Sequence, residues 1–410
     1  MAEILVLGAG MVGISTALAL QARGHDVTVV DRAAPGKETS FGNAGIIQAE
    51  AVEPYALPRD LATLLNITWR RTNDVSWTFR GVAGMIPALW GYFRSSGPKR
   101  YSEISTIYAQ LIAKATGDHE PLIAAAGVGN LIAKEGLSIF YRDPAKYEKA
   151  AKDAERITAR YGARHRAMDG EAYRREEPAL TKAPAGVVHW LDSWSCASPG
   201  DLVGAYAELF KSRGGRVLTG DAASLAGSGK GWSVAADGGT LEAEDAVIAL
   251  GPWSPGLLRG LGYRVPMVYK RGYHGHFEVP RTPIRPFMDT SVGVVATPTL
   301  AGLRIATGAA LVRRDSPPDI RQLDRGRAAL GDIIEIGKRI DEPQWVGTRP
   351  CMPDMLPMVG PAPRHKGLWF NFGHGHQGFT LGPTTGEMLA ALHAGEESDL
   401  AKALSPARRV

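Results

Sequence analysis

The chain has 410 residues, a formal net charge of +5 and a charged fraction of 22%. This length exceeds what one hydrophobic core serves, so we expect two domains, each with enough buried surface to be stable. The lysines and arginines are spread along the chain and form no dense runs, which argues against a nucleic-acid-binding protein.

The cysteine content argues against a disulfide framework and against a metal site. The two cysteines, Cys196 and Cys351, are typical of a chain from a reducing compartment, so the cytoplasm is the expected location. The first strand is expected at about residue 3, which leaves no room for a signal peptide. We also expect no membrane span, because no apolar stretch approaches the roughly 18 residues that one requires.

The first 31 residues have the layout of a dinucleotide-binding strand–helix–strand unit. An apolar run leads into Gly8, Gly10 and Gly13, a helix is expected from near Met11, and a second apolar run ends at Asp31. The first glycine permits a tight turn, the second lets the backbone approach a pyrophosphate, and the third lets the helix pack against the sheet. Asp31 can accept hydrogen bonds from ribose hydroxyls. An ordinary glycine-rich turn is the alternative.

A second glycine-rich segment follows the second strand. It consists of Thr39, Ser40, Phe41, Gly42, Asn43, Ala44 and Gly45. A simple nicotinamide enzyme does not need such a loop here, whereas a flavin, with its longer ribityl-isoalloxazine arm, needs small residues where the backbone passes under it. This segment therefore favours FAD over NAD.

The segment 64–102 is aromatic and basic, and Asp74 is its only acidic residue. Its aromatic and basic side chains include Trp69, Arg70, Arg71, Trp77, Phe79, Arg80, Trp90, Tyr92, Phe93, Arg94, Lys99 and Arg100. This composition suits an anionic lipid surface, so one hypothesis is a peripheral contact with the inner face of the cell membrane. The alternative is a helical cap whose aromatic side chains pack inward while its charges face water.

Two strands are expected in the middle of the chain. A short apolar strand at 245–250 ends in Gly251, where the backbone can again approach a ligand, and Trp253 follows. A longer strand is expected at 265–277, with Tyr269, Arg271 and Tyr273 on one face and Lys270 and His274 on the other. One of these faces is expected to line a pocket.

Near the C-terminus, glycines are interleaved with polar and aromatic side chains. The segment contains Gly373, His374, Gly375, His376, Gln377, Gly378, Phe379 and Thr380. Thr384 is a plausible N-cap for a helix over 387–392, whose positive end would point at the glycine loop. A glycine-rich loop that merely turns into a terminal helix is the alternative. The last eight residues are expected to form a solvated tail.

Taken together, these motifs resemble those of the FAD-dependent D-amino-acid dehydrogenases of the D-amino-acid oxidase/glycine oxidase superfamily. The resemblance rests on Gly8-x-Gly10-x-x-Gly13, the segment 39–45, Ala249-Leu250-Gly251-x-Trp253-Ser254, Arg349-Pro350-x-x-Pro353-Asp354-x-x-Pro357-x-Val359-Gly360 and Gly373-His374-Gly375-x-x-Gly378, in that order. It covers nearly the whole chain and is less specific about the substrate.

The resemblance implies an α/β fold, with a discontinuous Rossmann-like FAD-binding domain and an inserted α+β substrate domain. The expected boundaries place 1–50, 197–255 and 345–402 in the FAD-binding domain, and 51–196 and 256–344 in the substrate domain. Residues 403–410 form the tail.

The resemblance also implies that FAD contacts the glycine-rich motifs. The expected cofactor-binding residues are Gly8, Gly10, Met11, Val12, Gly13, Asp31, Arg32, Thr39, Ser40, Gly42, Asn43, Ala44, Gly45, Gly251, Trp253, Gly373, His374, Gly375, Gln377, Gly378, Phe379 and Thr380. Some relatives bind the flavin covalently through a cysteine upstream of the Pro-Asp pair. Cys351 lies closer to Pro353 than that cysteine does, so noncovalent FAD is expected.

The activity implied is oxidative deamination of a D-amino acid to the 2-oxo acid and ammonia, with hydride transfer from Cα to FAD. One alternative is oxidation of a secondary amino acid, such as D-proline, hydroxyproline or N-methylglycine, and a second is a non-catalytic flavin-binding sensor or subunit. The expected partners are a small amino-acid substrate and an electron acceptor, which is a quinone, another carrier or dioxygen.

The expected catalytic residues are Arg349, His376, Tyr273 and His274. Related enzymes place their carboxylate-binding arginine at the position of Arg349, where a surface ion pair is the alternative role. His376 stands where glycine oxidases carry another arginine, and it could accept a proton from the substrate, hydrogen-bond the flavin or cap backbone groups. Tyr273 and His274 either line the pocket or pack in the core. The reaction needs no base if the amine binds already deprotonated.

Overall fold

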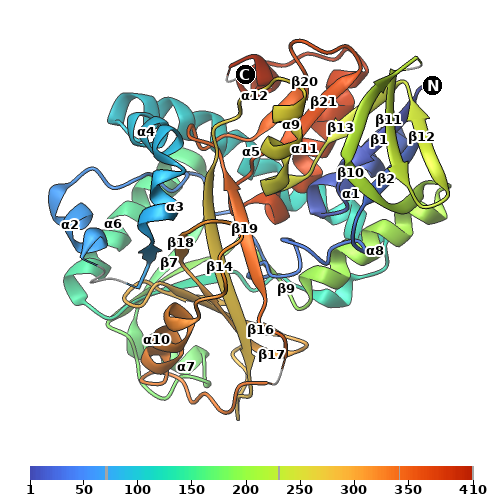
Figure 1. Cartoon of the computed structure of the whole chain (residues 1–410). Helices are drawn as coiled ribbons and strands as arrows, with labels where there is room; N and C mark the ends of the chain where they lie inside the picture. The colour runs from blue at the N-terminus through green and yellow to red at the C-terminus, as the bar shows by residue number, and fades with distance from the viewer. Residues whose placement is uncertain (70–72, 230, 341, 409–410) are drawn as a thin grey trace.

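The computed structural model describes residues 1–69, 73–229, 231–340 and 342–408. Its strands form an 8-stranded sheet, a 10-stranded sheet and a 3-stranded sheet. In Figure 1 the 8-stranded sheet and its helices occupy the right and upper part of the molecule, and the 10-stranded sheet occupies the centre and the lower left.

The 8-stranded sheet contains the dinucleotide-binding motif. Its strand order is β12 (Gly239–Ala243), β11 (Gly231–Ala236), β10 (Arg216–Ser228), β2 (Asp26–Asp31), β1 (Glu3–Leu7), β13 (Asp245–Ile248), β21 (Leu368–Phe372) and β20 (Met358–Pro361). The strands from β10 to β21 are parallel, whereas β11, β12 and β20 join in antiparallel pairs. The carboxyl ends of β1 and β2 therefore meet at one edge, where a doubly wound sheet binds its ligand.

Four helices share the hydrophobic core beside this sheet: α1 (Met11–Ala22), α5 (Pro98–Ala125), α8 (Pro199–Ser212) and α11 (Gly378–His393). The Ala- and Leu-rich sequence of α1 suits a buried helix, and Ile14 and Leu18 pack in one cluster with Tyr108 of α5 and Leu389 of α11. Small residues let α1 and α11 approach closely, because a Cβ on Gly386 would lie 2.9 Å from the Ser15 backbone.

The 10-stranded sheet forms the second half of the molecule. Its path is β4 (Val75–Trp77), β18 (Ala309–Leu311), β14 (Val268–Phe277), β17 (Gly302–Thr307), β16 (Val294–Thr299), β15 (Phe287–Asp289), β6 (Leu137–Tyr141), β8 (Gly186–Trp190) and β7 (His165–Asp169), with β19 (Val346–Cys351) paired to β14. The 3-stranded sheet contains β3 (Ile46–Ile47), β9 (Trp194–Cys196) and β5 (Ile132–Ala133).

The remaining helices are α2 (Leu61–Thr68), α3 (Phe79–Ala83), α4 (Ile86–Ser95), α6 (Pro144–Tyr161), α7 (Gly170–Glu176), α9 (Ser254–Gly260), α10 (Arg321–Leu330) and α12 (Asp399–Leu404). Short 3₁₀ turns lie at Gly129–Leu131, Gly251–Trp253 and Pro406–Arg408. Within the described residues, no helix is both long and apolar enough to cross a membrane.

The domain boundaries stay a prediction, but two elements lie differently from the expected division. α5, expected in the inserted part, packs in the core of the 8-stranded sheet, whereas β19, expected with the FAD-binding part, pairs with β14. α5 lies there because it buries an apolar face, and β19 lies there because its backbone pairs with that of β14.

Two local expectations at the C-terminus are wrong. Helix α11 begins at Gly378, so Thr384 is a buried residue inside the helix and not its N-cap. The expected solvated tail is packed as far as it is described: Leu404 is fully buried, and Arg408 forms an ion pair with Asp354 at 3.0 Å. Residues 409–410 lie outside the described residues.

Candidate functional site

A continuous cavity of about 890 Å³ connects the two large sheets. At one end it is lined by Gly8, Gly10 and Asp31, from the carboxyl ends of β1 and β2. At the other end it is lined by Lys270 of β14 and Arg349 of β19. A single space therefore joins the dinucleotide motif to the strand pair on which the carboxylate-binding arginine was expected.

The glycine motif forms a tight cradle at the first end. Gly8 has a φ of +114°, which side chains rarely adopt, and a Cβ on Gly13 would lie 1.8 Å from the Gly8 carbonyl oxygen. A Cβ on Gly10 would meet only Ser40 Oγ, at 3.3 Å, so this glycine leaves open space toward the cavity. Asp31 Oδ2 accepts a hydrogen bond from the Ala9 amide at 2.7 Å, which joins the turn to the end of β2.

These features fit an adenine dinucleotide with a flavin arm. The N-terminus of α1 faces the cavity, where its dipole favours a pyrophosphate. The cavity then continues past Gly42, Asn43 and Ala44 to the second sheet, which leaves room beyond the nucleotide. The N-terminal residues of α11, Gly378 and Phe379, line it as well, so the positive end of a second helix faces this space.

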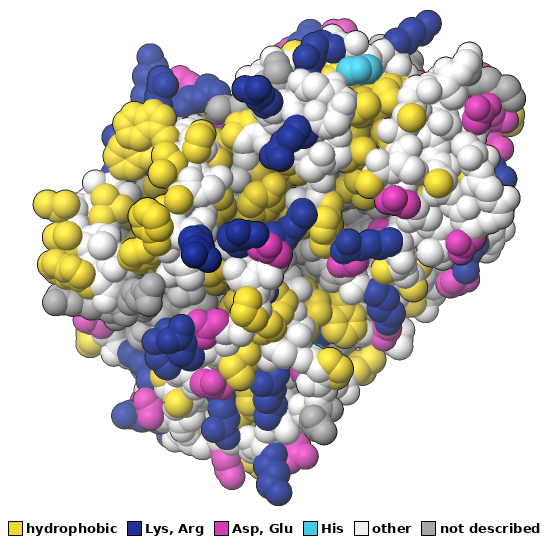
Figure 2. Space-filling view, viewed as in Figure 1, with side chains coloured by type: hydrophobic (Ala, Val, Ile, Leu, Met, Phe, Trp, Pro, Cys, Tyr) yellow, Lys and Arg dark blue, Asp and Glu magenta, His cyan; other side chains and the backbone are white. Residues whose placement is uncertain are grey.

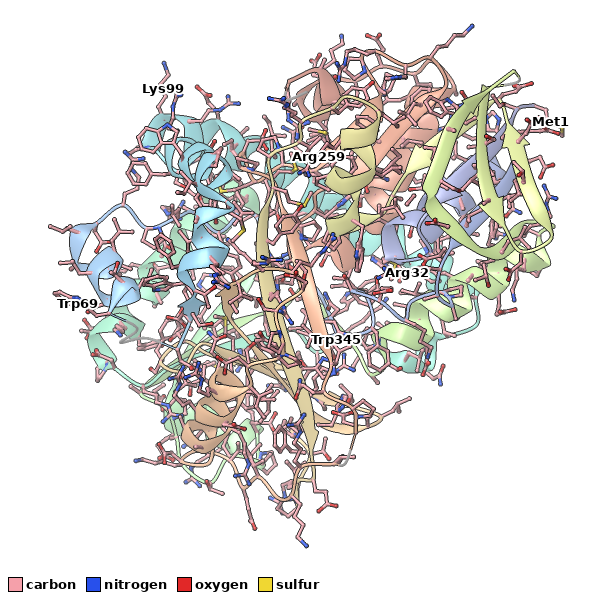
Figure 3. All side chains as sticks on the ribbon, in the orientation of Figure 1. Met1, Arg32, Trp69, Lys99, Arg259 and Trp345 are labelled. Carbon is pink, nitrogen blue, oxygen red and sulfur yellow. The ribbon has the colours of Figure 1, made fainter. Side chains whose placement is uncertain are left out.

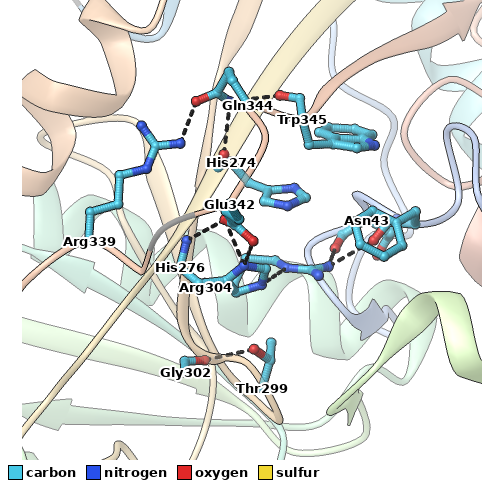
Figure 4. A network of polar contacts seen from close by, with 11 residues as sticks. Asn43, His274, His276, Thr299, Gly302, Arg304, Arg339, Glu342, Gln344 and Trp345 are labelled. Carbon is cyan, nitrogen blue, oxygen red and sulfur yellow. Dashed lines mark hydrogen bonds and ion pairs between the residues drawn. The ribbon is translucent and has the colours of Figure 1, made fainter.

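A buried polar network ties the loop 39–45 to the second sheet (Figure 4). Arg304 of β17 donates from Nη1 to the Asn43 carbonyl at 2.6 Å and to the Phe41 carbonyl at 3.1 Å. Its Nε donates to His276 Nε2 at 3.0 Å, so His276 carries its proton on Nδ1 and donates it to Glu342 at 2.8 Å. Burial lowers the pKa of Arg304 to about 10, which leaves it charged at neutral pH.

Arg349 presents a guanidinium to the second end of the cavity. Its Nη1 donates to the Gly308 carbonyl at 2.6 Å and its Nη2 to the Thr307 carbonyl at 3.0 Å. Gly272 on β14 makes room for the group, since a Cβ there would lie 2.9 Å from Nη2. Within the described residues Arg349 has no acidic partner, and burial lowers its pKa. A half-buried cation without an acidic partner is suited to hold an anion from a ligand.

His376 shares this end of the cavity with the two cations. Its ring lies 4.8 Å from that of Tyr55, and its Nε2 accepts a hydrogen bond from Gln377 Nε2 at 3.1 Å, so Nδ1 carries the proton. Burial lowers the pKa of His376 to about 3, and the charges of Arg349 and Lys270 act in the same direction. His376 is therefore a neutral hydrogen-bond donor at physiological pH and a poor base.

The other two expected catalytic residues, Tyr273 and His274, differ in their position relative to the cavity. Tyr273 lines the cavity and is almost fully buried. His274 is not among the lining residues, and its ring stacks on Trp345 with centroids 4.7 Å apart. Trp345, which Figure 3 labels near the centre of the view, does line the cavity. His274 therefore supports the wall from behind.

The expected cofactor-binding residues also differ in whether they line the cavity. All of them line the cavity except Gly13, Gly45, Gly373, Gln377 and Thr380. Three of these five contact other parts of the loops: Gly13 packs on Gly8, Gln377 Nε2 donates to Gln48 Oε1 at 2.7 Å, and a Cβ on Gly45 would lie 2.6 Å from the Cys196 carbonyl oxygen.

Glu50, Tyr55, Tyr92 and Lys270 also line the second end of the cavity and were not expected as site residues. Burial raises the pKa of Glu50, whose carboxylate accepts hydrogen bonds from Ser193 and Gln48. A signal for Lys270 was present, because it stands on a predicted strand, and a lysine is seldom removed from water inside a sheet.

The outer surface of α2, α3 and α4 is apolar. Leu61 is 71% exposed, Phe79 80%, Ile86 58% and Trp90 61%. Hydrophobic side chains gather at the left and upper left of Figure 2, over these helices, and Figure 3 labels Trp69 and Lys99 in the same region. The aromatic side chains of this segment are thus not all packed inward. Arg70 and Arg71 lie outside the described residues.

Comparisons with known proteins agree with the fold. The family model described as FAD dependent oxidoreductase matches residues 3–392. The chain is 29% identical to a D-amino acid dehydrogenase from Chromohalobacter salexigens, over 96% of both chains. It is 32% identical to a D-amino acid dehydrogenase from Paramagnetospirillum magneticum, over 97% of this chain and 96% of that protein.

Among solved structures, the chain is similar to a glycine oxidase from Geobacillus kaustophilus, with a TM-score of 0.76 and 18% identity over 100% of this chain and 99% of the other. At this identity the likeness concerns the fold alone. The expected α/β fold with a Rossmann-like FAD-binding part is confirmed.

Proposed function

The chain belongs to the family of FAD dependent oxidoreductases, and we propose that it oxidises a D-α-amino acid to the imino acid. Water then converts the imino acid to the 2-oxo acid and ammonia. The observation that carries the proposal is Arg349, a half-buried guanidinium that faces the cavity and has no acidic partner among the described residues. The names of the two D-amino acid dehydrogenases to which the chain is similar support this substrate class.

When bound, FAD supplies the acceptor for the two electrons of the substrate Cα–H bond. Arg349 binds the substrate carboxylate through N–H groups that its two backbone carbonyls leave free. The Nδ1–H group of His376 is a hydrogen-bond donor for a ligand in the cavity, and Tyr55 packs against the His376 ring. The positive charges of Arg349 and Lys270 disfavour an ammonium beside them, so a bound substrate amine loses its proton more easily. The neutral amine is the form from which hydride leaves.

FAD is held without a covalent bond in this proposal. Cys351 lines the cavity on β19, but burial raises the pKa of its thiol, so the nucleophilic thiolate is disfavoured. Acid precipitation should release FAD into the supernatant. Yellow colour retained in the pellet would refute noncovalent binding.

The experiment that tests the activity is an anaerobic screen of D- and L-amino acids against the purified holoenzyme. We expect D-amino acids to bleach the flavin absorbance and to yield ammonia. A persistent cyclic imine, or methylamine or formaldehyde, would indicate a secondary amino acid instead. If no amino acid bleaches the flavin, the protein is a flavin-binding sensor or subunit and the proposal is wrong.

We propose further that the exposed face of α2, α3 and α4 contacts anionic lipid and that the electron acceptor is a lipid-soluble quinone. The exposed apolar side chains Phe79 and Trp90 lie on this face, and Arg80, Arg94 and Lys99 beside them are exposed cations. Aromatic and basic side chains together favour a lipid interface. Leu64 and Leu89 of the same helices line the cavity, so this cover separates the cavity from the proposed lipid contact.

A double variant, Phe79→Ser with Trp90→Ser, tests this contact. It should co-sediment less with anionic liposomes at low salt and keep wild-type turnover with a soluble acceptor. The matched control is Leu300→Ser, because Leu300 is 72% exposed but lies in the turn between β16 and β17. If the double variant, the control and the wild type sediment equally, these helices only cover the cavity and do not bind lipid. The electron acceptor would then be dioxygen or a soluble carrier.

A further inference from the structure

Two cations lie at neighbouring positions of one strand pair at the second end of the cavity. β14 and β19 are antiparallel, and Lys270 lies directly opposite Arg349 in their register. Directly opposed residues project from the same face of a sheet, with Cβ atoms about 4.5–5.5 Å apart. Both residues line the cavity.

Lys270 is not neutralised by the protein. Its Nζ donates to Tyr92 Oη at 2.9 Å and lies 4.4 Å from the centre of the same ring. Within the part of the chain that the structure describes, no carboxylate forms an ion pair with Lys270 or with Arg349. Tyr92 therefore positions the ammonium without cancelling its charge.

Such an arrangement is costly for the empty protein. Like charges directly opposite each other in a sheet destabilise it, and removal from water disfavours each charge further. The α-carboxylate of a simple amino acid would neutralise only one of the two cations. A ligand with a second acid group, a short distance from the first, would neutralise both.

We propose that the physiological substrate is an acidic amino acid of the aspartate or glutamate type, with its α-carboxylate on Arg349 and its side-chain carboxylate on Lys270. This inference rests on the proposed function and specifies the substrate of the same site. The product is then a 2-oxo dicarboxylic acid. Lys270 then acts as a specificity determinant for the side chain of the substrate.

The first test compares kcat/KM for D-glutamate with D-glutamine, and for D-aspartate with D-asparagine. A charge-assisted hydrogen bond is present in only one member of each pair, so the wild type should prefer the acid by about 10- to 100-fold. Lys270→Met should reduce this preference to about threefold or less, mainly through KM, whereas Lys270→Arg should retain most of it. Lys149→Met, which removes an exposed cation on α6, should leave the preference unchanged.

The second test measures binding without turnover. Glutarate and its monoamide, glutaramate, are titrated into the holoenzyme while the flavin absorbance is recorded. Glutarate should bind at least about 10-fold more tightly to the wild type, and the two ligands should bind alike to Lys270→Met.

The outcomes separate this inference from the proposed function. If neutral D-amino acids bleach the flavin as readily as D-glutamate, the substrate class is wrong while the oxidation stands. The same conclusion holds if Lys270→Met keeps the preference for the acids. If no amino acid bleaches the flavin, the proposed function fails, and equal binding of glutarate and glutaramate then overturns the dicarboxylate site as well.

Discussion

Replacement of Arg349 by lysine tests the step on which the proposed reaction depends. Arginine has five N–H donors, and two backbone carbonyls occupy one on each terminal nitrogen, at 2.6 and 3.0 Å. Three donors remain for a substrate carboxylate. A lysine that kept both carbonyl bonds would have one donor left, so at least one charge-assisted hydrogen bond to the substrate is lost.

The loss of one such bond is about 1.5–3 kcal/mol, and the substrate Cα–H is also less well aligned. We therefore expect kcat/KM for the best D-amino acid to fall by on the order of 10²-fold or more, with FAD content unchanged. The assay adds a substrate analogue in which an amide replaces the α-carboxylate. The wild type should discriminate strongly against it, and Arg349→Lys should discriminate much less.

Arg271→Lys is the matched control. Arg271 is adjacent to Lys270 on β14 and is buried, and its Nη1 donates to the carbonyls of Arg313 at 3.2 Å and Ser316 at 2.5 Å, but it does not line the cavity. This control should lower stability and leave the discrimination between carboxylate and amide intact. Wild-type turnover by Arg349→Lys, or full retention of its carboxylate preference, would show that the clamp lies elsewhere.

Three further predictions concern the cofactor and stability. Gly10→Val should fold, because a Cβ there meets only Ser40 Oγ, but it should purify without FAD. A wild-type flavin content would show that the backbone at Gly10 does not approach the cofactor. Burial lowers the pKa of His119 to about 4 from 6.5, so the unfolded state binds more protons between these values and stability falls as the pH drops through that window. His119→Gln should reduce the slope of the unfolding free energy against pH by up to about 1.4 kcal/mol per pH unit, as measured by urea unfolding at pH 7, 6 and 5. An unchanged slope would show that His119 does not cause this pH dependence. Arg408→Ala should lower the free energy of unfolding in denaturant, because it removes the ion pair with the fully buried Asp354 and the hydrogen bonds that Arg408 donates to the Leu356 and Pro357 carbonyls, and an unchanged free energy of unfolding would count against it.

The cofactor cradle could be predicted because its chemistry is local. Gly8 and Gly13 lie within one turn and the start of one helix, and backbone sterics alone demand glycine at both positions, whereas Gly10 leaves open space toward the cavity. The strands at 3–7 and 26–31 and the helix from Met11 agree with the prediction for the same reason.

The other features of the site depend on contacts between segments that are far apart in the sequence. The pairing of β14 with β19 joins Lys270 to Arg349 across a long stretch of sequence, and no periodicity within either segment encodes that register. The same is true of His274, which supports Trp345 instead of lining the cavity, and of Phe79 and Trp90, which face outward. The sequence by itself therefore determined the family, and it predicted a glycine-rich turn and an arginine that the structure places along one cavity. Only the tertiary structure decided which side chains share the cavity with that arginine, because contacts between distant segments depend on how the sheets pair and pack and not on local backbone preference.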